Sequence, residues 1–147
     1  MDFKELDLKL AKYFEERGWV CMFNELEDKE LGAFACKAIE GKNVVGLGIS
    51  FVDEMSFSVY YTLGNIIGEK RRPEILRLIN ELNIESAYTK ATLNGVTVAV
   101  AFINSIDTDD GLIGNLSFIE DQLFSGECFK IINKIFKHVK SIKVEAQ

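Results

Sequence analysis

Polar and apolar residues alternate through residues 56–63, which read Ser56-Phe57-Ser58-Val59-Tyr60-Tyr61-Thr62-Leu63. Successive side chains of a β-strand point to opposite faces of the sheet, so this stretch predicts a strand with one apolar face. That face carries Phe57, Val59, Tyr61 and Leu63. We expect it to meet the core, while the other face is wetter.

Further strand-like segments lie on both sides of this one. They are residues 19–23, 32–39, 44–52, 87–93 and 96–103. Turns are expected at 41–43 and 53–55, and a charged loop at 25–30; strands joined by such short connections form an antiparallel meander. Asn94-Gly95 separates the last two segments. An Asn-Gly pair between alternating residues is a strong signal for a two-residue hairpin.

Helical patterns precede and interrupt the strands. Residues 2–17 carry apolar residues at helical spacing and are followed by Gly18, a natural helix stop. A second helix is expected to open at residues 69–74, where Pro73 suits the first turn because its missing N–H costs nothing there.

The C-terminal third predicts a last helix at residues 116–139, weakened at Ser125-Gly126. An acidic, glycine-containing loop is expected before it at 105–115, and a frayed tail after it at 140–147. The order α-β-β-β(-β)-α-β-β-α indicates an α+β fold, in which an antiparallel sheet packs against helices on one side. We find no repeat or linker that would divide residues 1–147, so a single domain is expected.

Composition narrows the classes of partner and location. The chain has 147 residues, a net charge of −6 and a pI of about 4.9. This charge repels nucleic acid and anionic membrane surfaces, so neither is an expected partner. No apolar run approaches the roughly 20 residues that span a bilayer, and the N-terminus lacks a signal-peptide core. Three cysteines without a pairing pattern predict reduced thiols and a cytoplasmic protein.

A search for chemistry identifies no catalytic, metal or cofactor residues. His138 is the only histidine and lies near a helix C-terminus, where the helix dipole favours it. The cysteines Cys21, Cys36 and Cys128 lack the spacing of a zinc site and suit apolar surroundings. Residues 107–111 miss the calcium-loop register, because Leu112 takes the glycine position. The glycines at 46 and 48 lie within a strand pattern, so they do not form a dinucleotide-binding loop. We therefore expect no enzyme.

Two surface features could contact a partner. Lys70, Arg71 and Arg72 form the only basic cluster, which could hold an anionic partner segment or be a solvated connector. The last helix has a wide apolar stripe with a candidate interface at Phe129, Ile132, Phe136 and Val139. Large apolar patches often mark interfaces, but core packing would explain the same residues.

The helix at residues 70–83 carries a family resemblance. It reads Lys70-Arg71-Arg72-Pro73-Glu74-Ile75-Leu76-Arg77-Leu78-Ile79-Asn80-Glu81-Leu82-Asn83. It resembles the helix that the YbjN family places after its three-stranded meander, with a basic-Pro-Glu opening, an aliphatic stripe and an Asn near the end. The following hairpin and final helix, and the Gly18-Trp19 pair entering the first strand, are also similar, so the resemblance covers about residues 17–137. The long loop at 105–115 and the very apolar last helix depart from it.

That resemblance implies a type III secretion chaperone-like fold, whose members are dimeric α/β proteins that bind extended partner segments. It transfers no catalytic residue. We therefore predict a non-enzymatic protein-binding module, an adaptor, chaperone-like or regulatory protein that forms a homodimer in the bacterial cytoplasm. The alternative is a small-ligand sensor with a pocket between sheet and helices, lined by Phe57, Tyr61 and Phe102.

Overall fold

The structure is a computed structural model of the chain. It describes residues 3–25, 32–39, 41–53, 56–105 and 109–142. Most of the expected loop at 25–30 and of the turn at 53–55 lies outside the described residues. The elements are α1 (Phe3–Arg17), β1 (Val20–Glu25), β2 (Gly32–Ile39), β3 (Asn43–Asp53), β4 (Ser56–Ile66), the 3₁₀ helix η1 (Glu69–Arg71), α2 (Arg72–Glu85), β5 (Lys90–Asn94), β6 (Thr97–Ser105), α3 (Asp109–Leu123), α4 (Gly126–Phe136) and β7 (Val139–Lys140).

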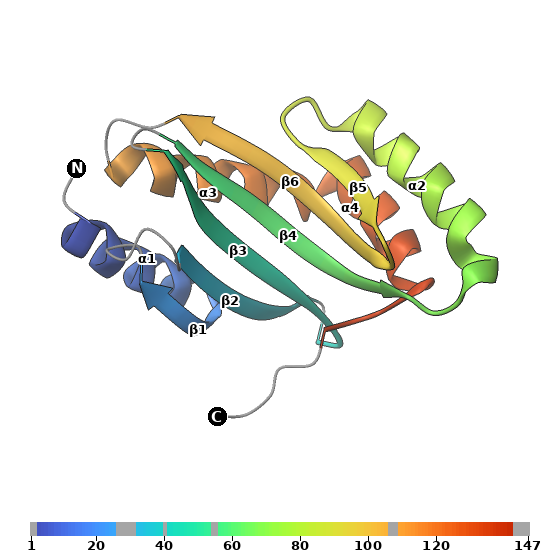
Figure 1. Cartoon of the computed structure of the whole chain (residues 1–147), viewed down its shortest axis with the longest axis horizontal. Coiled ribbons are helices and arrows are strands. Elements are labelled where there is room, and N and C mark those ends of the chain that lie inside the picture. Colours follow the sequence, from blue (N-terminus) through green and yellow to red (C-terminus); the bar gives the residue numbers. More distant parts are fainter. Residues whose placement is uncertain (1–2, 26–31, 40, 54–55, 106–108, 143–147) are drawn as a thin grey trace.

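The strands form one antiparallel sheet of seven strands (Figure 1). Its order is β1-β2-β3-β4-β6-β5, and the short β7 pairs with β4. The structure therefore contains the expected meander, β1 to β4, and the expected hairpin, β5 and β6. The second strand of the hairpin, β6, pairs with β4, so β5 is an edge strand of the sheet. The predicted α+β class, with an antiparallel sheet and helices, is confirmed.

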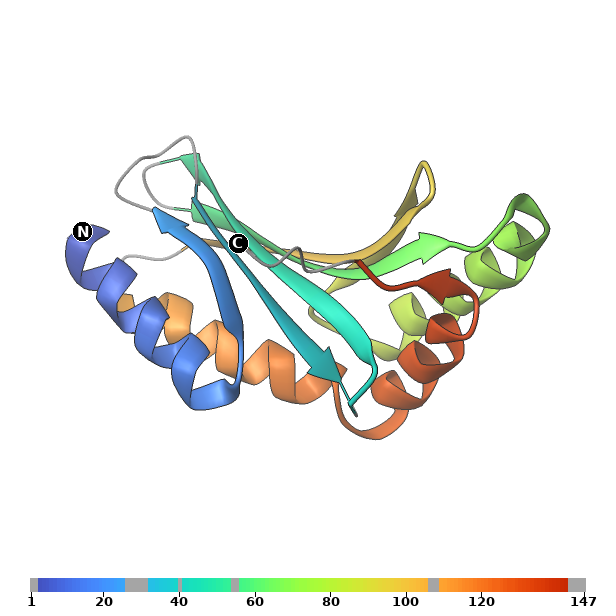
Figure 2. The same ribbon diagram turned by 90° about the horizontal axis from the view of Figure 1, so that it is seen from below.

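The helices and the core lie on one side of the sheet. Figure 2 shows α1, α3 and α4 beneath it and α2 beyond its end, next to α4. The predicted apolar face of β4 is buried, since Phe57, Val59 and Leu63 are all 0% exposed. None of the described helices is long and apolar enough to span a membrane.

The opposite face of the sheet is concave in Figure 2, with no helix of the described chain over it. Small residues occupy much of its centre, among them Gly46, Gly48, Ala99 and Ala101. Among the described residues, the C-terminal segment reaches this face, where Ile142 lies over Gly46, and no helix covers the rest of it.

The expected loop at residues 105–115 is wrong from Asp109 onward, because α3 begins there. Gly111 and Gly114 weaken the local helix signal. Tertiary packing overrides it, since Leu112, Leu116 and Leu123 are all 0% exposed. The rest of the expected loop, residues 106–108, lies outside the described residues.

The last helix is interrupted where its weakening was predicted, since α3 ends at Leu123 and α4 begins at Gly126 after the N-cap Ser125. The end of α4 differs from expectation, because it lies at Phe136 instead of residue 139. Val139 and Lys140 then form β7 on β4, so Lys140 is not part of a frayed tail. Residues 143–147 of that tail lie outside the described residues. At the hairpin, β5 starts at Lys90, three residues later than expected.

Candidate functional site

The apolar stripe on the last helix belongs to the core of the single chain. Ile132 is 0% exposed, Phe136 is 7% and Val139 is 6%, and Phe129 packs half-buried against the same core. Three of the four side chains are therefore buried in the core of the chain, and Phe129 alone keeps part of its surface exposed. As a partner interface, the four residues stay a prediction.

Two of the three residues expected to line a ligand pocket between sheet and helices lie in the core. Phe57 and Tyr61 are 0% and 1% exposed and pack in the main core. Phe102 instead borders an open groove of about 610 Å³ at the β5 edge, together with Tyr88 and Lys90.

The cysteines and His138, the candidates for catalysis or metal binding, do not form a common site among the described residues. All three cysteines are free; Cys36 and Cys128 are buried, and burial raises the pKa of both thiols. His138 follows α4 and contacts Arg71. Among the described residues, no group of three His, Cys, Asp or Glu side chains could hold a metal ion.

A buried carboxylate connects α3 to α1, to the residue before β1 and to β2. Glu120, on α3, has a side chain that is only 7% exposed. Its Oε1 accepts hydrogen bonds from the Tyr13 hydroxyl at 2.9 Å and from the Trp19 indole N–H. Its Oε2 lies 3.3 Å from Arg17 Nη1 and 3.4 Å from Lys37 Nζ. Helix α1, the residue before β1 and strand β2 thus meet at one side chain.

The contacts of Glu120 indicate that this cluster holds secondary-structure elements together. Buried charges are tolerated only when paired and hydrogen-bonded, and this carboxylate has both kinds of partner. Burial raises the pKa of Tyr13, and the negative charge of Glu120 raises it further, so the phenol stays protonated and donates. Four donors occupy the carboxylate and leave no evident position for a substrate. We interpret the cluster as the clamp that holds α1 and α3 to the sheet.

The local sequence does not distinguish Glu120 from a surface carboxylate, because adjacent acidic residues such as Glu120 and Asp121 are common on exposed helix faces. Its neighbour Ile119 and the i−4 residue Leu116 belong to the buried stripe of α3, so Glu120 lies at the margin of that stripe. Its partners are more than 80 residues away in sequence. Their proximity becomes visible only in the folded chain.

Aromatic side chains form a row on the open face of the sheet. The register aligns Phe23 with Phe34, Phe34 with Gly48, and Gly48 with Tyr60 across four strands. The rings of Phe23 and Phe34 stack with centroids 6.3 Å apart. A Cβ at Gly48 would lie 2.0 Å from the Tyr60 ring, so that glycine makes room for the aromatic ring.

This aromatic row ends at β1, which is an edge strand of the sheet. Val20 is 60% exposed and Phe23 is 43% exposed. Proteins usually protect such edges with Lys, Pro or a bulge. Residues 20–25 contain neither Lys nor Pro, and one irregularity lies between Cys21 and Phe23. The other edge, β5, is one residue shorter and carries the exposed Lys90.

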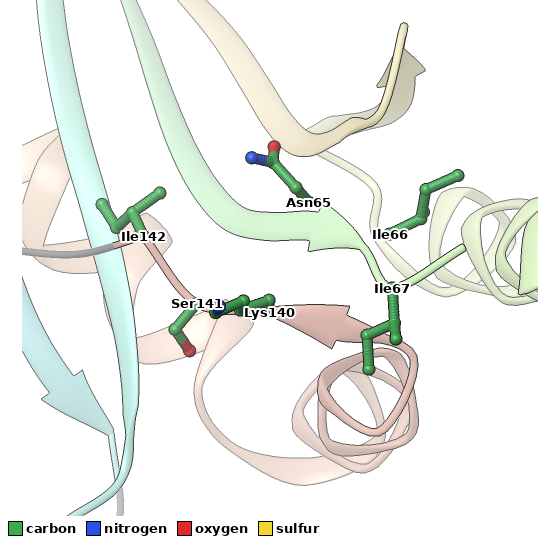
Figure 3. A pocket seen from close by; sticks show the side chains of 6 residues that line it. All are labelled: Asn65, Ile66, Ile67, Lys140, Ser141 and Ile142. Atoms are coloured by element: carbon green, nitrogen blue, oxygen red, sulfur yellow. The ribbon is translucent and has the colours of Figure 1, made fainter. Parts of the chain in front are cut away.

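A second open feature lies where β4 leaves β3. The β3–β4 pairing reaches Gly46 and Thr62, and β4 then bends and pairs with β7. The resulting cavity has a volume of about 630 Å³ (Figure 3). Its lining residues, which we call the β7 fork, are Asn65, Ile66, Ile67, Lys140, Ser141 and Ile142.

The basic cluster lies beside this fork. Arg71 Nη1 is 3.2 Å from His138 Nδ1, and the Ile67 N–H donates to the His138 carbonyl at 3.0 Å. Arg72 instead binds Glu69 at 2.8 and 2.9 Å and donates to the Gly95 carbonyl. The three adjacent cations therefore have different surroundings, and Arg72 is neutralised by its own neighbour.

Comparison with known proteins identifies the fold. No family model and no curated protein matches the sequence. Among solved structures, YbjN from E. coli, a candidate transcription regulator, superposes with a TM-score of 0.58 at 11% identity, covering 90% of this chain and 93% of that one. The Yersinia pestis type III secretion chaperone SycH, solved with a fragment of YscM2, has a TM-score of 0.40 at 18% identity, covering 85% of this chain and all of that one. The chain therefore has the fold of YbjN, as its sequence resemblance predicted.

Proposed function

We propose that the chain is a non-enzymatic protein-binding module that takes up an extended partner segment along β1. The observation that supports this most is the exposed edge strand β1, which continues into the row Phe23, Phe34 and Tyr60 on the face of the sheet opposite the helices. An extended peptide can add to such an edge as a further strand, with main-chain hydrogen bonds providing affinity.

The side chains of β1 indicate the chemistry of that partner. Alternate residues of an added strand face the same side of the sheet as Val20 and Phe23. A partner with apolar residues at alternate positions would bury these two exposed side chains. Each fully buried side chain of this size contributes about 1.5–3 kcal/mol before the cost of ordering the peptide. This predicts a partner strand with an alternating apolar pattern.

An adaptor or chaperone-like role fits a domain with an exposed edge strand. It also fits a domain whose buried polar network, the Glu120 cluster, joins its own helices to the sheet. We place it in the cytoplasm, since all three cysteines are unpaired.

The test replaces both exposed apolar side chains of β1. The double variant Val20→Lys/Phe23→Lys adds edge lysines of the kind that block strand addition. Leu8→Lys is the matched control, because Leu8 is 73% exposed on α1. Partners captured by the wild-type protein from a lysate of its source cells are identified by mass spectrometry and mapped with overlapping synthetic peptides.

We expect the double variant to lose binding of the mapped peptide, while Leu8→Lys keeps it. Equal binding by all three proteins would place the partner elsewhere and refute the β1 site. Circular dichroism melting of each variant establishes that lost binding does not reflect lost folding.

We also propose that two copies of the chain associate through the apolar patch at Tyr88 and Phe118. Their rings meet edge to face with centroids 5.2 Å apart, yet they are 57% and 50% exposed. Exposed apolar patches often mark interfaces. Light scattering during size exclusion should give twice the chain mass for the wild type and one chain mass for Tyr88→Ser/Phe118→Ser. A monomeric wild type at micromolar concentration would refute the dimer.

A further inference from the structure

Basic residues from two distant stretches of the chain meet at the β7 fork. Arg71 contacts His138, whose carbonyl accepts a hydrogen bond from the N–H of Ile67 in the cavity lining. Lys140 is the register partner of Asn65 and also lines the cavity. Lys140 is thus part of the opening, and Arg71 lies next to it through His138.

In the described part of the chain, neither Arg71 nor Lys140 forms an ion pair, whereas Arg77, on the adjacent helix, is paired with both Glu74 and Glu81. The whole protein carries a net charge of −6. A local excess of positive charge on an acidic protein attracts anionic groups to that surface.

The cavity itself is amphipathic. Ile66, Ile67 and Ile142 provide apolar surface, and Ile67 is 59% exposed. Asn65 and Ser141 add polar groups to the same lining (Figure 3). Asn65 Oδ1 accepts a hydrogen bond from the Thr97 hydroxyl at 2.7 Å and Ser141 Oγ accepts one from the Val44 N–H at 3.2 Å, which leaves the Asn65 NH₂ and the Ser141 O–H as donors for a ligand. A volume of about 630 Å³ is ample for one or two side chains and falls within the usual range of ligand pockets.

We infer that the β7 fork binds an acidic, extended peptide segment. An apolar side chain of the peptide lies against the isoleucines, and flanking carboxylates meet Lys140 and Arg71. A nucleic acid would use the same cations, but the net charge of −6 opposes a polyanion. This surface is separate from β1 and does not depend on the function proposed for that strand.

The test uses a fluorescein-labelled decapeptide of alternating Glu and Leu, with a Lys-Leu peptide of the same length as its charge control. We expect the Glu-Leu peptide to raise fluorescence anisotropy on binding and the Lys-Leu peptide not to. Arg71→Glu/Lys140→Glu should weaken binding by about tenfold or more, since each change replaces an attraction with a repulsion. Raising the salt concentration should also weaken binding, because charges at an exposed surface are screened.

Lys12→Glu on α1 is the matched charge control and should bind like the wild type, since Lys12 lies on a different helix with its side chain 76% exposed. The β1 variant Val20→Lys/Phe23→Lys should also retain the peptide, which separates this site from the β1 site. Arg71→Gln/Lys140→Gln gives a milder loss if the double charge reversal does not fold.

Three results would overturn the inference. The first is equal binding of the Glu-Leu peptide by the wild type and by both double variants at residues 71 and 140. The second is no binding of that peptide by the wild type. The third is that a poly-dT oligonucleotide binds through the same residues more tightly than the peptide does.

Discussion

The buried side chains of Tyr13 and Tyr61 differ in whether their hydroxyl groups form a hydrogen bond. Tyr13 donates to the Glu120 carboxylate at 2.9 Å, whereas the Tyr61 hydroxyl is buried with no hydrogen-bond partner in the described structure. Tyr61 packs its ring against Trp19 and Phe124, with centroids 6.1 and 5.8 Å away. Its ring therefore stabilises the core, while its hydroxyl is desolvated without compensation.

Phenylalanine substitutions separate these two effects. Tyr61→Phe removes an unsatisfied hydroxyl and should leave the free energy of unfolding unchanged or raise it by up to about 1 kcal/mol. Tyr13→Phe removes one of the hydrogen-bond donors to Glu120, so it should lower the free energy of unfolding by about 1–3 kcal/mol. Urea unfolding measures both. A loss of more than about 1 kcal/mol in Tyr61→Phe would mean that an ordered water satisfies the hydroxyl.

Asn83 links α2 to β5 through two hydrogen bonds. Its side-chain amide donates to the Ala91 carbonyl at 3.0 Å and accepts from the Ala91 N–H at 2.6 Å. Asn83→Ala breaks both and should cost about 1–3 kcal/mol of unfolding free energy. Asn80→Ala, at an exposed position on the same helix, should change it by no more than about 0.5 kcal/mol. Equal effects in urea unfolding would show that the link adds no stability.

At the level of elements, β7 depends on a glycine in β4. Gly64 has a φ of 136°, and a Cβ there would lie 2.5 Å from the Lys140 carbonyl oxygen. Gly64→Ala should therefore detach β7 and speed the exchange of the Ile67 amide, which donates to His138. Gly41→Ala is the control, because Gly41 has a φ of 82° but nothing within 4 Å of its Cβ.

Both variants carry the cost of positive φ, about 1 kcal/mol. Only Gly64→Ala should add a loss that hydrogen exchange traces to the Ile67 amide, since the Ile66 amide donates to the Val96 carbonyl instead. Equal exchange rates for Ile67 in the two variants would contradict the close approach of β7 to β4.

Elements that depend on local pattern could be predicted from the sequence. The alternation of residues 56–63, the Asn94-Gly95 turn and Pro73 each act within a few residues, and each correctly identified its element. The start of α3 and the strand β7 could not be predicted, because they depend on distant partners. Two glycines obscure the first turns of α3, and β7 is too short to form without the bend at Gly64.

At the scale of the whole molecule, the sequence predicted the layers but not which faces stay open. The apolar residues of the last helix looked available to a partner, yet the sheet and α2 bury them. The open edge β1 and the β7 fork depend on strand order, which joins residues far apart in sequence. Periodicity reports that a face is apolar, but tertiary packing decides whether it is covered.

The buried tyrosines also predict how the whole protein responds to alkaline pH. An unfolded tyrosine has a pKa of about 10. In the folded chain, burial raises the pKa of Tyr13 and Tyr61, and the charge of Glu120 raises both further. Above about pH 10 the unfolded chain therefore releases protons that the folded chain keeps, so the free energy of unfolding falls as pH rises.

Each such tyrosine lowers the free energy of unfolding by up to about 1.4 kcal/mol per pH unit in that range. The buried thiols of Cys36 and Cys128, whose pKa values are also raised, act in the same direction from a lower pH.

Tyr61→Phe removes one of the two buried tyrosines that cause this pH dependence, and it breaks no hydrogen bond of the described structure. Its stability should therefore decline less steeply with pH than that of the wild type when urea unfolding is measured from about pH 9 to 11. Tyr88→Phe, at a position 57% exposed, should follow the wild type. Parallel curves for Tyr61→Phe and the wild type would mean that Tyr61 ionises as readily in the folded chain as in the unfolded one, and that the core around Glu120 opens at alkaline pH.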